Sequence, residues 1–250
     1  VSALEITAFL AFFPSFSSGP IDRSRRFLAD WNRVLKREEY MELCGTGIWK
    51  LLLGAVYKMV IAAGAYKVMG YFDTGTAWYH WVGYAYAYGI YLFFDFAGYS
   101  LMAVGSSYML GIETPENFRQ PFISRDIREF WDRWHITLSH WFRDFIFTRF
   151  VMYSSKKKWF STRLQRACAG FFVDMGIMGL WHGITPSYIL YGLYHGLLLA
   201  ATETYQKKSK FYKKHKNKTW YQVISWAVTM QLVFFGFFLF SGKLMELVGF

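Results

Sequence analysis

The sequence predicts an all-α fold, a polytopic bundle of membrane helices with amphipathic helices that lie at the interface or re-enter the membrane. Of the 250 residues, 54% are hydrophobic and 22% aromatic, which is typical of membrane proteins with aromatic belts. Apolar runs of membrane length alternate with polar segments. The net charge of +11 is clustered in those polar segments, which favours anionic lipid or an acidic partner over nucleic acid.

The first half of the chain contains two candidate spans, residues 45–68 and 81–110. Before them, residues 2–13 form an apolar run too short to cross a membrane alone, and a break rich in Ser, Gly and Pro follows at 14–20. Lysines interrupt the first span, and we expect them to snorkel or to face protein. We interpret residues 1–250 as one membrane domain, the C-terminal part of a longer protein whose earlier spans are missing here.

The middle of the chain is too polar to span but contains an amphipathic stretch. Its apolar side chains recur at steps of three and four, which predicts one stripe on one helix lying in the interface or closing the bottom of the bundle. The stripe consists of Trp131, Trp134, Leu138, Trp141 and Phe145.

Three further apolar runs follow, and basic clusters precede the first and the last of them. The positive-inside rule therefore places the basic loops in the cytoplasm and the intervening loops on the other side. The apolar runs are 167–180, 186–202 and 220–240. The predicted cytoplasmic segments are 21–37, 111–166 and 207–218, and the segments predicted on the opposite side of the membrane are 71–80, 181–186 and 241–250.

His182 is the first candidate for chemistry, because histidine transfers protons near neutral pH and ionisable groups at membrane depth suggest function. The run 167–180 before it would rise about 21 Å, less than a hydrocarbon core of about 30 Å. Unless the helix starts earlier, His182 therefore lies within the membrane. It could act as a general base, with Gly183 permitting close approach and Trp181 forming a wall. The alternative is a core histidine bonded to a backbone carbonyl.

His135 is the second candidate and lies on the predicted amphipathic helix, on the cytoplasmic side. Asp132 and Ser139 would share its helix face, and Asp132 could fix its tautomer. The alternative is a polar face at the membrane interface. We interpret His195 as a hydrogen-bonded packing residue. A re-entrant or tunnel-lined bundle between His135 and His182 could carry a reactive group inward.

Asp95 is a carboxylate inside a predicted span, where it costs about 2.5–3.5 kcal/mol unless it is paired. Lys58 could pair with it, and a structural ion pair is favoured over substrate contact. The sequence contains no Gly-x-Ser-x-Gly, phosphate-loop or His-Glu-x-x-His motif, and Cys44 and Cys168 lack neighbours at metal-ligand spacing. We therefore expect neither a covalent serine enzyme nor a metalloenzyme.

Four motifs occur in an order that closely resembles the membrane-bound O-acyltransferase (MBOAT) family. They are FFP with GPIDR (12–14 and 19–23), FDFAGYS (94–100), RWHITLS with WFRD (133–139 and 141–144) and WHG (181–183). The resemblance implies an acyltransferase with its invariant histidine at His182 and a second, less uniform histidine at His135. It makes substrate-binding candidates of Trp181, Gly183, Trp134, Ser139 and Asp95.

Residues 130–151 most resemble the branch of this family that transfers D-alanine to teichoic acid. The resemblance implies that D-alanine arrives as a thioester on the phosphopantetheine arm of a small acidic cytoplasmic carrier protein. It ends on a poly(glycerol phosphate) hydroxyl of teichoic acid outside the cell, directly or through another membrane protein of the pathway. We therefore expect no bound cofactor and no metal, and a multi-pass protein in the plasma membrane of a Gram-positive bacterium.

An apolar patch beside positive charge suits docking of that acidic carrier, with charge steering the encounter. A membrane-interface anchor is the alternative. The patch consists of Arg149, Phe150, Val151, Met152, Tyr153, Lys156, Lys157 and Lys158.

The sequence leaves two rival functions open. An O-acetyltransferase for an exported polysaccharide would share all four motifs and differ in donor and acceptor. A transporter or lipid scaffold without chemistry would favour internal repeats, which the sequence lacks. In the favoured mechanism, the carrier arm enters near His135, the thioester reaches His182 through a tunnel, and His182 deprotonates the attacking hydroxyl.

Overall fold

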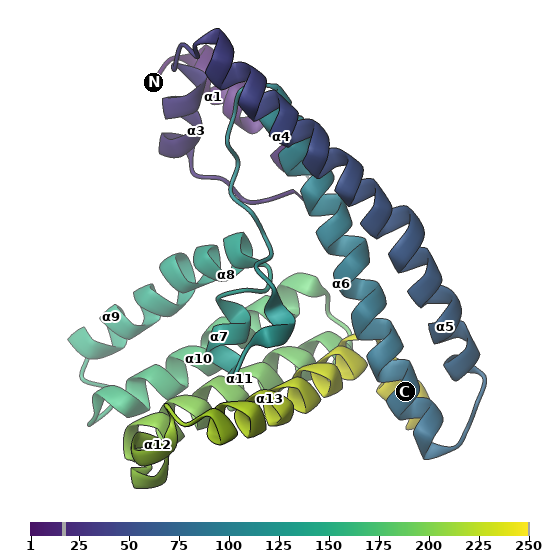
Figure 1. Cartoon of the computed structure of the whole chain (residues 1–250). Coiled ribbons are helices and arrows are strands. Elements are labelled where there is room, and N and C mark those ends of the chain that lie inside the picture. Colours follow the sequence, from purple (N-terminus) through teal and green to yellow (C-terminus); the bar gives the residue numbers. More distant parts are fainter. Residues whose placement is uncertain (17–18, 250) are drawn as a thin grey trace. The chain divides into compact units, whose positions relative to one another are not determined.

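The computed structural model describes residues 1–16 and 19–249, and every element assigned within them is a helix (Figure 1), which confirms the all-α prediction. Residues 17 and 18 of the predicted break and residue 250 lie outside the described residues. The chain divides into two compact units, and each is described by itself. The first consists of residues 1–83, 90–119 and 136–138, and the second of 84–89, 120–135 and 139–250. The single membrane domain stays a prediction.

The first unit begins with short helices rather than with one continuous helix over residues 2–13. Helix α1 (Ala3–Leu10) starts at a capping box between Ser2 and Glu5 and ends three residues before Phe13. Helix α2 (Phe13–Phe16) then begins with Pro14 in its first turn, where a proline is tolerated. The N-terminal run is therefore interrupted. Helix α3 (Ser24–Trp31) buries Phe27 against this region.

The two long helical segments of the first unit correspond to the predicted spans. Helix α4 (Arg37–Val56), the π-helix η1 (Tyr57–Ala62) and α5 (Ala63–Asp73) follow one another without interruption, and α6 (Trp78–Met109) lies beside them (Figure 1). By length and composition, Arg37–Asp73, Trp78–Met109 and Thr219–Phe240 are candidate membrane spans. Three of the predicted apolar runs are thus confirmed as helices able to cross a membrane.

Glycines let α4 and α6 approach closely, as small residues do between membrane helices. A Cβ atom on Gly54 would lie 2.6 Å from the carbonyl oxygen of Gly98, so the two backbones are in contact there. Near this contact, Lys58 forms an ion pair with Asp95. The predicted ion pair is confirmed, and it offsets the cost of a carboxylate inside a candidate span.

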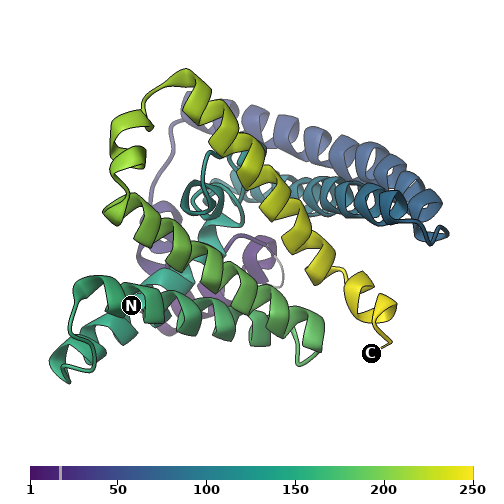
Figure 2. The same ribbon diagram turned by 90° about the horizontal axis from the view of Figure 1, so that it is seen from below.

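The second unit is built on three long helices with shorter ones packed around them. Helices α10 and α11 form an antiparallel hairpin, and α13 packs against α11 (Figure 2). The long helices are α10 (Arg163–His182), α11 (Pro186–Lys208) and α13 (Thr219–Phe240). The shorter ones are η2 (Pro121–Ile123), α7 (Ile127–Trp131), η3 (Arg143–Phe147), α9 (Thr148–Lys156), α12 (Lys210–His215) and α14 (Lys243–Leu247).

Helix α10 starts at Arg163, four residues before the predicted apolar run. A capping box between Thr162 and Gln165 fixes this start. Its 20 residues rise about 30 Å, which equals the thickness of a hydrocarbon core. The length of the helix therefore no longer places His182 inside the membrane. In the described part of the chain, α10 and α11 are not among the candidate spans.

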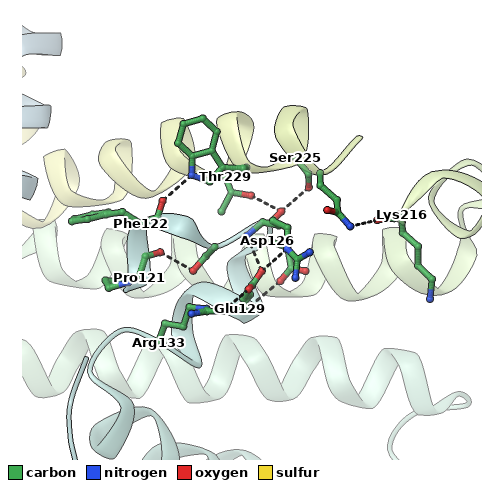
Figure 3. Close-up of polar contacts among 12 residues, drawn as sticks. Pro121, Phe122, Asp126, Glu129, Arg133, Lys216, Ser225 and Thr229 are labelled. Carbon is green, nitrogen blue, oxygen red and sulfur yellow. Dashed lines mark hydrogen bonds and ion pairs between the residues drawn. The ribbon is translucent and has the colours of Figure 1, made fainter. Parts of the chain in front are cut away.

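Hydrogen bonds join the segment before α7 to α13 (Figure 3). The hydroxyls of Ser225 and Thr229 donate to the carbonyl of Arg125 at 2.6 and 3.1 Å, and Trp226 Nε1 donates to the carbonyl of Phe122 at 2.7 Å. Asp126 then caps α7 by accepting from the backbone N–H of Glu129 at 2.9 Å. These bonds fix where α7 begins and thereby place the tryptophans that follow.

Candidate functional site

His135 lies at a break between two helices and not on one continuous helix. Helix α7 ends at Trp131, and α8 (Ile136–Phe142) begins after His135, whose φ of 44° and ψ of 50° are left-handed. The prediction of a single apolar stripe on one helix from Trp131 to Phe145 is therefore wrong. Asp132 and Ser139 do not share a helix face with His135 either. Such a conformation in a residue other than glycine is uncommon, and it is concentrated at functional sites.

Hydrogen bonds to Asn117 explain why the helix breaks. Within the first unit, the N–H of Ile136 donates to the Asn117 carbonyl at 2.9 Å, and the Thr137 hydroxyl donates to Asn117 Oδ1 at 2.6 Å. These bonds satisfy the first turn of α8 from outside the helix, so its N–H groups need no preceding turn. Sequence periodicity contains no sign of such a partner.

Two predicted substrate-binding residues support the break. Trp134 is buried between the rings of Phe130 and Phe237, with centroid distances of 5.5 and 4.9 Å. The Ser139 hydroxyl donates to the Trp134 carbonyl at 3.2 Å. Both contacts hold the backbone on either side of His135. A substrate contact by these residues stays a prediction.

His182 ends α10 and is surrounded by aromatic rings. Its ring centroid lies 4.8 Å from Trp181, 5.0 Å from Phe240, 5.9 Å from Tyr188 and 6.3 Å from Tyr191. Among the described residues, its ring accepts and donates no hydrogen bond. The alternative of a core histidine bonded to a backbone carbonyl is therefore not supported.

Gly183 makes the turn that follows His182. Its φ of 155° and ψ of 164° belong to a region that only glycine adopts readily. A Cβ atom there would also lie 2.9 Å from the Tyr188 ring. The close backbone approach expected at Gly183 is thus present, although it is to Tyr188. Trp181 contacts the His182 ring but is 58% exposed.

The two histidines are held neutral by their surroundings. Burial, and to a lesser extent the positive charge of a protonated His182, together lower the pKa of His135 to about 3. Burial lowers the pKa of His182 to about 4. Desolvation disfavours the charged imidazolium, so both rings are neutral at pH 7. A neutral imidazole has a free nitrogen lone pair and can accept a proton.

His195 is a buried packing residue, which confirms the interpretation from the sequence. Trp131 Nε1 donates to His195 Nδ1 at 3.3 Å, and the ring of Tyr191 packs on the histidine at 4.6 Å. His195 is 1% exposed. It therefore anchors the last residue of α7, immediately before the break that carries His135.

A cavity of about 460 Å³ lies within the second unit, between the short helices and the α10–α11 hairpin. Ser139 and Val151 are the predicted site residues that line it, whereas His135 and His182 do not. Sequence reasoning missed Asp174 in this cavity, although a single acid within the apolar run 167–180 was a visible signal. The other lining residues include buried Trp131, Met175, Met178, Leu199 and Glu203, and the more exposed Arg128, Asp132, His140, Arg143, Arg163 and Lys207.

The predicted docking residues lie on α9 and just after it, and most are exposed. Met152 is 63% and Tyr153 52% exposed, and Lys157 Nζ lies 5.9 Å from the centre of the Tyr153 ring. Trp159, which sequence reasoning missed, packs on Tyr153 at 5.3 Å and is itself 56% exposed. We call Arg149, Met152, Tyr153, Lys156, Lys157 and Trp159 the α9 patch. Phe150 and Val151 are half-buried, and Lys158 is exposed.

Metal ligands do not gather anywhere in the described residues: no group of three or more His, Cys, Asp or Glu side chains could hold an ion. Asp95 belongs to the first unit, where it is paired with Lys58. The second unit contains the two candidate histidines, His135 and His182, whose imidazoles are neutral, and aromatic rings surround that of His182.

Comparison with known proteins agrees with the motifs. The model of the membrane-bound O-acyltransferase family matches residues 1–243. A teichoic acid D-alanyltransferase from Bacillus subtilis is 45% identical over 94% of this chain and 60% of its own length, and one from Lacticaseibacillus rhamnosus is 43% identical over 96% and 62%. A "Probable alginate O-acetylase AlgI" from Pseudomonas syringae pv. tomato is 33% identical over 98% of this chain and 45% of its own length. The chain thus spans about three fifths of the D-alanyltransferases that it matches.

Proposed function

Because the chain belongs to the membrane-bound O-acyltransferase family, we propose that it carries the acyl-transfer site of a membrane enzyme that attaches D-alanine to teichoic acid. The 45% identity to a teichoic acid D-alanyltransferase over nearly the whole chain supports this acyl group and acceptor. The single observation that carries the site assignment is that His182 is a neutral histidine surrounded by aromatic rings, with no hydrogen-bond partner for its ring among the described residues. We further propose that the protein lies in the plasma membrane of a Gram-positive bacterium and crosses it several times.

The proposed reaction is transfer from a thioester to a hydroxyl. His182 takes the proton of the acceptor hydroxyl as the oxygen attacks the thioester carbonyl carbon, which forms the ester bond. The carbon–sulfur bond then breaks, and the imidazolium returns the proton to the departing thiolate. Atoms and charge balance without a metal, a redox partner or a covalent enzyme intermediate. A general base of this kind contributes about 10²–10⁴ in rate.

His135 is assigned to the donor side of the reaction. Its neutral ring and left-handed backbone are held by the packing of Trp134 and by the anchored end of α7. We propose that the thioester passes this ring on its way to His182. His135→Ala should therefore lower transfer but leave more activity than His182→Ala.

The proposed donor is D-alanine on the phosphopantetheine arm of an acidic carrier protein. The α9 patch supports this partner, because exposed apolar side chains at its centre are flanked by lysines and an arginine. A membrane-interface anchor would use the same residues, and direct binding of the carrier protein separates the two. The acceptor is a teichoic acid hydroxyl, reached directly or through another membrane protein of the pathway.

A second candidate function is acetyl transfer to an exported polysaccharide, which the 33% identity to the alginate O-acetylase favours. Reconstitution of the full-length protein in liposomes distinguishes the two. Carrier protein loaded with labelled D-alanine is added, and loss of label is followed for wild type and His182→Ala, with His215→Ala on α12 as the control. Loss that requires His182 supports the proposal. Turnover with an acetyl donor and none with D-alanyl carrier would assign the protein to the acetyltransferases.

A further inference from the structure

Asp174 is a buried acid whose charge nothing in the described chain neutralises. It lies on α10, is 8% exposed and lines the cavity of the second unit. Its carboxyl accepts one hydrogen bond from the backbone of Phe147, but Oδ1 has no partner among the described residues. Burial raises the pKa of Asp174 to about 7. A carboxylate in this position is stable only with a proton or with a cation beside it.

The other acids that line the cavity are already satisfied. Glu203 forms ion pairs with both Arg128 and Lys207, and Asp132 is exposed to solvent. Arginine and lysine lie at the exposed edge, whereas Asp174 lies deeper, beside Met175 and Met178. The cavity therefore combines an apolar interior, a basic edge and one inner carboxyl with an unused acceptor.

A primary ammonium matches this carboxyl best among small cationic groups. It supplies a positive charge and three N–H donors, and one of them can bond to Oδ1. A metal ion is disfavoured, since no three potential ligands converge in the described residues. D-Alanine carries such an ammonium on the carbon next to its reacting carbonyl, and an acetyl group does not.

We propose that Asp174 binds the ammonium of the aminoacyl donor and thereby makes the enzyme selective for an aminoacyl group over a plain acyl group. This inference rests on the proposed function, because it needs a carrier-bound acyl group that reacts at His182. Asp174 would be a specificity-determining residue with no part in proton transfer.

The spacing on α10 allows Asp174 and His182 to act on one substrate. They are eight residues apart, which is about 12 Å of axial rise and about 80° around the helix. Helical side chains all lean toward the N-terminus, so both side chains shift alike and the axial separation stays at about 12 Å. Four distances connect the Asp174 carboxylate with the His182 ring through a bound substrate. They are carboxylate to ammonium (about 2.8 Å), ammonium to carbonyl carbon (about 2.5 Å), carbonyl carbon to attacking oxygen (about 3 Å) and attacking oxygen to imidazole (about 2.8 Å). Extended, these steps reach about 11 Å, comparable with the axial separation.

The test compares two donors that differ only in the amino group. The full-length enzyme in liposomes is given carrier protein loaded with D-alanyl or with propionyl, and kcat/KM is measured for both. Asp174→Asn should lower kcat/KM for D-alanyl carrier by about 10- to 100-fold, the usual effect of losing a hydrogen bond to a charged group. It should change kcat/KM for propionyl carrier by less than about threefold. Asp144→Asn, an exposed acid on η3, is the matched control and should leave the ratio unchanged.

The propionyl reaction also reports whether the variant folds. An equal fall in kcat/KM for both donors would show a structural role for Asp174 and overturn the inference. Values of kcat/KM that stay at the wild-type level for both donors would overturn it too. A wild-type enzyme that uses D-alanyl carrier through His182 without discriminating against propionyl carrier would contradict the inference alone. A wild-type enzyme that uses neither donor would overturn the proposed function and the inference with it.

Discussion

Replacing Gly183 with alanine should displace His182 and remove transfer activity. The φ of 155° at this position costs a residue with a Cβ atom about 1–3 kcal/mol. The new Cβ would also meet the Tyr188 ring at 2.9 Å, so that ring must shift. Overpacking of this kind typically adds about 1–3 kcal/mol. We therefore expect the free energy of unfolding to fall by about 2–6 kcal/mol, summed from these two effects.

The same helix offers a matched control. Gly176 lies inside α10, and a Cβ there would meet nothing within 4 Å. Gly176→Ala should therefore be neutral or stabilise the helix by up to about 1 kcal/mol. Thermal unfolding in detergent and D-alanyl transfer would be measured for both variants. The double variant Gly183→Ala/Tyr188→Ala should recover the loss of unfolding free energy that the clash causes, but not the loss that the unfavourable backbone conformation causes. A Gly183→Ala enzyme as stable and active as Gly176→Ala would refute this reasoning.

Three further predictions follow from the site. Because burial lowers the pKa of His182 to about 4, this base stays neutral down to that pH. The single-turnover rate with propionyl carrier, which lacks the ammonium that Asp174 would bind, should therefore be flat from pH 8 to about 5, and a fall centred near the ordinary histidine value of 6.5 would contradict this assignment. Trp131→Phe leaves His195 Nδ1 without its donor and should lower the free energy of unfolding by about 1–3 kcal/mol, measured by thermal or chemical unfolding; an unchanged stability would argue against the anchor. The double variant Lys156→Glu/Lys157→Glu should weaken carrier binding at least about tenfold and reduce its salt dependence. The control Lys213→Glu/Lys214→Glu on α12 should do neither, and equal effects of the two double variants would show that the α9 patch is not the docking surface.

Much of the fold was predictable because it depends on local patterns. Apolar length identified the runs that became α6 and α13, and an unpaired acid in a span required a partner, which Lys58 supplies. The true start of α10 was also encoded, since Thr162 and Gln165 have the spacing of a capping box.

The features that escaped prediction depend on distant residues or single positions. Helical periodicity continues through Trp131, Trp134 and Leu138, yet Asn117 satisfies the first turn of α8 and the helix breaks at His135. Asp174 was hidden by the apolar residues around it, because only the packed structure shows that it lines a cavity. Tertiary contacts decided both cases.

The central claim is that His182 removes the proton from the acceptor hydroxyl. The most direct measurement is single-turnover transfer of labelled D-alanine from its carrier protein by the full-length enzyme in liposomes, comparing wild type with His182→Gln and with His215→Gln as the control. We predict that His182→Gln lowers the rate constant by about 10²–10⁴, with carrier binding and thermal stability unchanged, while His215→Gln behaves as wild type. A His182→Gln enzyme that transfers D-alanine at the wild-type rate would contradict the account.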